Sequence, residues 1–96
     1  MPCGAADWAR WPVGTVFRIC RTGEVCRVDD IGWALAGRNT IDLYKPSRAA
    51  MNQWGLRNEA IEILQWGSLH ESLRILKPRA RFPHVARMID QIEDQI

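Results

Sequence analysis

The chain has no long apolar run, no internal repeat and no block of like charge. A membrane-spanning helix needs about 20 consecutive apolar residues, and no stretch approaches that length, so membrane insertion is not expected. The formal charge is only +2 and the arginines are spread along the chain, which gives no charge argument for a nucleic-acid partner. With 96 residues, 47% apolar and 25% charged, the composition is that of one ordinary globular domain.

Cysteine is scarce, and its spacing does not suit a metal site. The three cysteines, Cys3, Cys20 and Cys26, cannot all pair within one chain, and no Cys-x-x-Cys pair exists. The two histidines, His70 and His84, lie far from them in the sequence. We therefore expect no bound metal and no other cofactor.

The spacing of two cysteines also bears on disulfide formation. Thr22-Gly23 is a turn signal between Cys20 and Cys26. A two-residue turn there would place Cys20 opposite Val25, which is the wrong register for a direct cross-strand bond to Cys26. Free, partly buried thiols are therefore the expected state.

Short strands dominate the first two thirds of the chain. Alternating apolar and polar residues predict strands over residues 14–20, 24–29, 41–44 and 59–66. Gly32 and Gly37 bracket a short apolar piece, which indicates close backbone approach rather than a regular helix. Short strands with glycine corners favour a small barrel over an open sheet, so the expected fold class is mainly β.

Three helices are expected after residue 47. Ser47 is a suitable N-cap and Gly55 a suitable stop for a helix over 48–54, and Ser68 begins a capping box for a helix over 69–76.

Pro83 opens the last helix, whose apolar stripe consists of Val85, Met88, Ile89, Ile92 and Ile96. The expected organisation is thus a barrel domain over 1–67 and a helical C-terminal extension over 68–96 that packs on it.

Three aspartates lie in settings that suit a functional acid: Asp7, Asp30 and Asp42. In the strand over 41–44, alternation places Asp42 and Tyr44 on the face opposite the two apolar residues. A carboxylate in such an apolar strand must be desolvated, paired or used in catalysis. Acid catalysis is one interpretation, and a backbone cap or a surface charge at each aspartate is the other.

The aspartates occur in ordered motifs. Asp7 precedes Pro12-Val13-Gly14-Thr15 by five residues, and then follow Asp30-Ile31-Gly32-Trp33-Ala34-Leu35-Ala36-Gly37, Ile41-Asp42-Leu43-Tyr44 and Trp54-Gly55. Over residues 5–66 the chain resembles the Asp-Asp-Asp (3D) domain family, which includes the catalytic barrel of membrane-bound lytic transglycosylase A and stationary-phase cell-wall proteins. Trp33 replaces a glycine and Ala36 a lysine of the family pattern, and one extra residue lies within Arg38-Asn39-Thr40.

The resemblance implies a double-psi β-barrel that acts as a peptidoglycan lytic transglycosylase. Such an enzyme cleaves the MurNAc–GlcNAc bond and leaves 1,6-anhydroMurNAc. By the same resemblance, Asp42 is the general acid and then the base, and Asp30 is a neighbouring acid that assists it. An acid in this role must be protonated when it meets the substrate, which burial or a nearby like charge favours.

Further residues are expected to bind or support the substrate: Asp7, Thr15, Gly32, Trp33, Gly37 and Tyr44. Asp7 is expected to order its loop or to hydrogen-bond Thr15. Trp33 is the best candidate for stacking on a sugar ring, because a flat indole suits the apolar face of a pyranose. Trp8 and Trp11 either wall the groove or fill the core, and Trp54 and Trp66 are expected in the core.

Two other functions compete with catalysis. A non-catalytic module would bind or loosen glycan, as expansin-like barrels do. A nucleic-acid binder that uses the arginines is a weaker alternative, and we expect no nucleic-acid partner. The expected partner is a peptidoglycan glycan strand, bound by a monomer in the cell envelope or outside the cell. The given chain shows no signal peptide, so a phage origin or a longer gene product would have to explain export.

Overall fold

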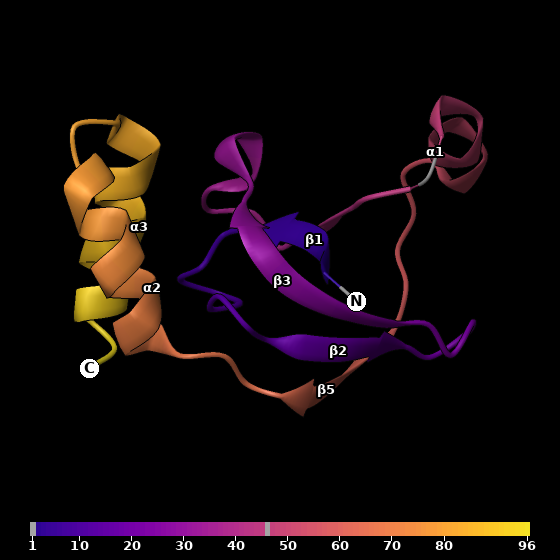
Figure 1. Ribbon diagram of the computed structural model, residues 1–96, viewed down its shortest axis with the longest axis horizontal. Helices are drawn as coiled ribbons and strands as arrows, with labels where there is room; N and C mark the ends of the chain where they lie inside the picture. Colours follow the sequence, from indigo (N-terminus) through magenta and orange to yellow (C-terminus); the bar gives the residue numbers. More distant parts are fainter. Residues whose placement is uncertain (1, 46) are drawn as a thin grey trace.

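A computed structural model describes residues 2–45 and 47–96. Its five strands are β1 (Pro2–Ala6), β2 (Val16–Ile19), β3 (Val25–Ile31), β4 (Asp42–Leu43) and β5 (Ile61–Gln65). The helices are α1 (Arg48–Trp54), α2 (Leu69–Leu76) and α3 (Pro83–Glu93), with 3-10 turns η1 (Trp33–Leu35) and η2 (Lys77–Arg79). Figure 1 shows α2 and α3 at one end of the sheet and α1 beyond the opposite end.

The strands form one mixed sheet in the order β4-β1-β3-β2-β5. In the described part of the chain this sheet is open, with β4 and β5 as its edges, so the prediction of a closed barrel is wrong. The mainly β class holds only loosely, because three α-helices accompany the five strands. Apolar residues of α2 and α3 cover the part of the core that a closed barrel would otherwise enclose.

Strand β1 was not predicted, and it organises the sheet. It pairs parallel with β3 on one side and antiparallel with β4 on the other, so it lies between two strands that follow one another in the chain. Its residues have low strand propensity, but small side chains allow close approach. A Cβ on Gly4 would lie 3.2 Å from the Ile41 side chain.

The C-terminal helices share one hydrophobic core with the sheet. Of the predicted α3 stripe, Val85, Met88, Ile89 and Ile92 are buried against sheet residues, whereas Ile96 lies beyond the helix and is 56% exposed. Two polar contacts also tie the helices to the first motif: Val13 N–H donates to Ser72 Oγ at 3.0 Å, and Gln95 Nε2 donates to Ala9 O at 2.9 Å. The boundary at residue 67 stays a prediction.

The predicted helix signals are confirmed at α1 and α2. Ser47 Oγ accepts the Ala50 N–H, and Gly55 ends α1 with φ +65°. Ser68 Oγ accepts the Glu71 N–H at 2.9 Å. The Glu71 carboxylate, however, pairs with Arg74 one turn later instead of closing the capping box.

The connection between β2 and β3 is longer than the predicted two-residue turn. Ile19 N–H donates to Glu24 O, and Phe17 lies opposite Cys26. The predicted register, with Cys20 opposite Val25, is therefore wrong.

The expectation of free thiols holds at only one of the two described cysteine side chains. Cys20 is free, although it is exposed rather than partly buried. Cys26 is buried and disulfide-bonded, so the expectation is wrong there. The expectation for Cys3 lies outside the side chains that the structure describes.

Candidate functional site

Asp30 and Asp42 lie in one row across three strands. Ala5 of β1 pairs with Asp30 of β3 on one side and with Asp42 of β4 on the other. Residues paired in this way project from the same face of a sheet. Since neighbouring strands lie about 4.8 Å apart, the Cα atoms of the two acids are separated by about 10 Å. The structure thus brings both predicted acids to one face.

A β-bulge sets the direction of Asp30. Val28 is buried, so strict alternation would also bury Asp30, yet Asp30 is exposed and Ile31 is buried. The register shifts between Gly4 and Ala5, because β3 has one extra residue opposite that step. Such an extra residue reverses the faces of the residues that follow. Sequence alternation gave no sign of this bulge.

Tyr44 is hydrogen-bonded to Asp30 and feels the charge of Asp42. Its hydroxyl donates a 2.8 Å hydrogen bond to Asp30 Oδ2, and Asp30 Oδ1 accepts the Ile31 N–H at 2.8 Å. Desolvation, the hydrogen bond to Asp30 and the negative charges of Asp30, Asp29 and Asp42 raise the pKa of Tyr44 to about 12. The phenol therefore remains a hydrogen-bond donor at neutral pH. We call Asp29, Asp30, Asp42 and Tyr44 the acid face.

Asp7 lies inside the protein and away from the acid face. Its side chain is fully buried, Oδ1 accepts the Ala9 N–H at 2.9 Å, and Oδ2 accepts the Gly37 N–H at 2.6 Å. The Arg10 Nε lies 3.9 Å from Oδ2. These contacts agree with the loop-ordering role expected for Asp7.

The alternative bond between Asp7 and Thr15 is wrong. The buried Thr15 hydroxyl donates to Pro12 O at 2.7 Å and accepts the Gly67 N–H at 3.0 Å. It therefore fastens the first motif to the start of α2. Thr15 supports the fold and does not reach the acid face.

At both motif glycines the nearest atoms belong to side chains rather than to the backbone expected from the sequence. A Cβ on the buried Gly32 would lie 2.6 Å from Leu35 Cδ1. Gly37 has φ +78°, and its carbonyl accepts a 3.0 Å hydrogen bond from Arg10 Nη2.

Trp33 packs against the beginning of α3. Its ring centroid lies 4.1 Å from that of His84 and 5.3 Å from that of Phe82, while 61% of the residue stays exposed. The contacts with the C-terminal segment occupy part of the indole. Its use as a sugar platform stays a prediction.

The other tryptophans divide between core and surface. Trp8 is buried, and its Nε1 donates to Asp30 O at 2.9 Å, so it anchors the backbone of β3 at Asp30. Trp11 is partly buried against the core. The prediction of a core position is wrong for Trp66, which is 61% exposed. Trp54 is half-buried, and Lys45 and Arg57 lie over its ring.

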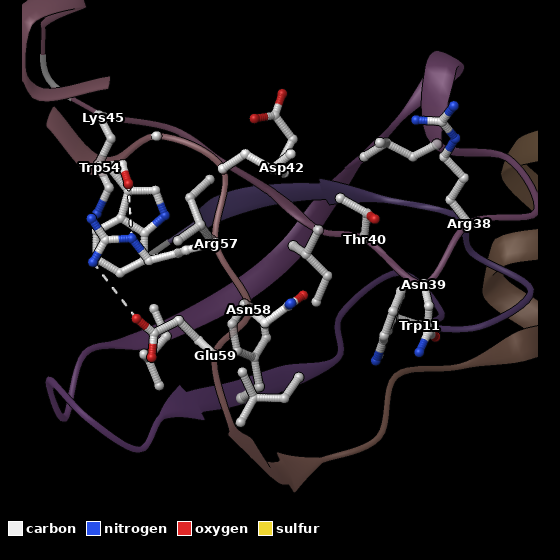
Figure 2. A pocket seen from close by; sticks show the side chains of 18 of the residues that line it. Trp11, Arg38, Asn39, Thr40, Asp42, Lys45, Trp54, Arg57, Asn58 and Glu59 are labelled. Carbon is white, nitrogen blue, oxygen red and sulfur yellow. Dashed lines mark hydrogen bonds and ion pairs between the residues drawn. The ribbon is translucent and has the colours of Figure 1, made fainter. Parts of the chain in front are cut away.

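A pocket of about 680 Å³ lies on the apolar side of β4. Its floor includes Phe17 and Ile19, and its walls come from residues 38–43 with Lys45 and from residues 54–59 with Met51. Figure 2 shows Asp42 at the rim, with its carboxylate directed away from the centre of the pocket. The pocket and the acid face therefore meet at Asp42, and sequence reasoning missed the pocket-lining cations Arg38, Lys45 and Arg57.

No family model matches the chain, and neither does any curated protein or solved structure. Within residues 2–45 and 47–96, no group of three or more His, Cys, Asp or Glu residues could hold a metal ion. None of the helices described there is long and apolar enough to cross a bilayer.

Proposed function

We propose that the chain is a peptidoglycan lytic transglycosylase domain of the 3D type, acting on the MurNAc–GlcNAc bond in the cell envelope or outside the cell. The row Asp30–Ala5–Asp42, with Tyr44 bonded to Asp30, is the observation that carries the proposal. The ordered motifs supply the substrate class. In this reading Asp42 is the acid and base, and Asp30 assists.

The reaction needs one carboxyl group that acts twice. Asp42, as the acid, protonates the glycosidic oxygen while the bond from that oxygen to the anomeric carbon breaks. The resulting carboxylate then takes the proton of the sugar's own C6 hydroxyl, whose oxygen bonds to the anomeric carbon. The 1,6-anhydro ring closes, Asp42 regains its proton, and no water is consumed.

Asp30 and Tyr44 would position and stabilise. The Ile31 N–H and the Tyr44 hydroxyl fix the Asp30 carboxyl group at one end of the row. A preorganised acidic group there would stabilise the positive charge that develops at the anomeric carbon. Since Asp42 is exposed, its desolvation would come from the bound glycan strand.

The proposal includes a relation between this fold and the double-psi β-barrel. A ψ-type arrangement has one strand lying between two others that are connected to each other. β1 lies in this way between β3 and β4, which supports one such element. The open sheet would then be an unclosed relative of the barrel.

The test is digestion of purified murein followed by mass analysis of the soluble products. We expect anhydro-muropeptides from the wild type and none from Asp42→Asn. Asp90→Asn is the matched control, because Asp90 is an exposed aspartate on α3 and outside the acid face. Products with ordinary reducing ends would mean hydrolysis, and unaltered murein would contradict cleavage.

A second candidate is a non-catalytic glycan-binding or wall-loosening module. The exposure of Asp42 favours it, because a catalytic acid is commonly enclosed in a site that excludes water. This function predicts that the protein sediments with murein and releases no fragments. It also predicts that the Asp42→Asn variant binds murein as well as the wild type does.

A further inference from the structure

The lining of the pocket beside β4 has more cationic than anionic side chains. Its charged lining residues are Arg38, Lys45, Arg57, Asp42 and Glu59. Glu59 is already engaged by Arg21 at 2.9 Å and by Arg57 at 3.7 Å, and Lys45 Nζ lies 3.5 Å from Glu24 Oε1. The Asp42 carboxylate is directed away from the pocket (Figure 2). An anionic group entering the pocket would therefore meet the cation Arg38, which has no carboxylate partner in the described residues, and two further cations that each have one.

Two cations are held at one end of the pocket by Trp54. Lys45 Nζ lies 4.2 Å and the Arg57 guanidinium carbon 4.3 Å from the centroid of the indole. Arg57 Nε also donates to Trp54 O at 2.8 Å. These contacts fix the direction of the charges before any ligand arrives, which reduces the ordering needed on binding.

Arg38 stands at the other end. Figure 2 shows it across the pocket from Lys45 and Trp54, with Asn39, Thr40 and Asn58 between. Arg38 is exposed, and within the described residues its side chain has no ion pair or hydrogen bond. Its guanidinium can thus donate to a carboxylate.

The remaining lining indicates the class of ligand. Phe17 and Ile19 form an apolar floor, and the side-chain amides of Asn39 and Asn58 offer donors and acceptors above it. A ligand that matches this set combines small apolar groups, amides and carboxylates, which are the groups of a short acidic peptide. The volume of about 680 Å³ is in the usual range for a small-ligand site.

We propose that this pocket binds the acidic peptide stem that muramic acid carries, an inference that rests on the proposed function. β4 is an edge strand of two residues, and Asp42 belongs to both the acid face and the pocket rim. A glycan lying on the acid face therefore has only this short edge between its muramic acid and the pocket. A stem carboxylate would pair with Arg38 at one end. Lys45 and Arg57, which already pair with Glu24 and Glu59, would add positive charge at the other end.

The experiment is an NMR titration of the full chain with a muramyl dipeptide that has a free carboxylate. We expect shifts of backbone amides in residues 38–45 and 54–59, and binding about tenfold weaker for Arg38→Gln, the loss expected for one charge-assisted contact. Arg48→Gln, a charge removal at an exposed position of α1 outside the pocket, should bind as the wild type does. The fully amidated dipeptide should bind as weakly as the free dipeptide binds to Arg38→Gln.

A second variant adds a negative charge and replaces the side-chain amide of Asn58. Asn58→Asp places a carboxylate on the exposed wall and should also weaken binding of the acidic dipeptide, with no change in melting temperature. Absence of binding to the wild type, equal binding of the amidated dipeptide, or equal affinities for Arg38→Gln and Arg48→Gln would overturn the inference. Cleavage of peptide-free glycan, measured separately, shows whether the proposed reaction stands when the stem site fails.

Discussion

Asp7 Oδ2 accepts a 2.6 Å hydrogen bond from the Gly37 N–H, which joins the first aspartate motif to the last residue of the second. The other oxygen accepts the Ala9 N–H, and the side chain is fully buried. Asp7 therefore holds together the loops on which the acid face is built. These contacts agree with the loop-ordering role that the sequence favours for Asp7.

Asp7→Asn should lower the free energy of unfolding by about 1–3 kcal/mol, because an amide nitrogen would face one of the two N–H donors and leave it unsatisfied. Urea denaturation measures the change. Asp90→Asn, at an exposed position of α3, should stay within about 0.5 kcal/mol of the wild type. Equal stability of the two variants would show that the buried contacts of Asp7 contribute nothing.

Gly67→Ala should be more damaging, by about 3 kcal/mol or more, because backbone atoms cannot move aside as a side chain can. A Cβ there would lie 2.2 Å from Val13 O and 2.6 Å from Pro12 O. Gly23→Ala is the control: its φ of +76° gives backbone strain of about 1–2 kcal/mol, and nothing lies within 4 Å. Thermal melting of both variants tests the difference, and a milder effect at Gly67 would contradict the close approach.

The sequence predicted the local structure better than the arrangement of the sheet. Helix α1 and helix α2 have their predicted bounds, because the capping serines act within one turn of the chain. β1 was missed, because its small residues show no strand pattern and its place depends on pairing with residues far along the chain. The openness of the sheet follows from the same long-range pairings.

In the candidate site, too, local patterns were predicted from the sequence and long-range contacts were not. Alternation correctly placed Asp42 on the other face of the strand from Ile41 and Leu43, since the two-residue period is a property of the strand itself. The direction of Asp30 depends on a bulge against β1, and the burial of Asp7 depends on Gly37. The catalytic and binding roles of these residues stay predictions.

Ser68→Ala and Ser47→Ala remove the same N-cap bond from two different helices. α2 buries Ser72, Leu73 and Leu76, so loss of the Ser68 cap should lower global stability by about 1 kcal/mol. α1 has no buried residue, so its loss of the Ser47 cap should change global stability by less than about 0.5 kcal/mol. Urea denaturation measures both changes. A larger global loss for Ser47→Ala would show that α1 belongs to the cooperative core.

Tyr44→Phe tests the acid face through its pH dependence. Burial and the neighbouring acids raise the pKa of Tyr44 from 10.0 to about 12, so the folded state favours the protonated phenol. The stability gained from this preference is present below pH 10 and is lost as the pH rises through 12. The wild type should therefore lose more unfolding free energy than Tyr44→Phe between these values, measured by urea denaturation across the range. Identical pH profiles would mean that the Tyr44 hydroxyl does not interact with Asp30 in solution.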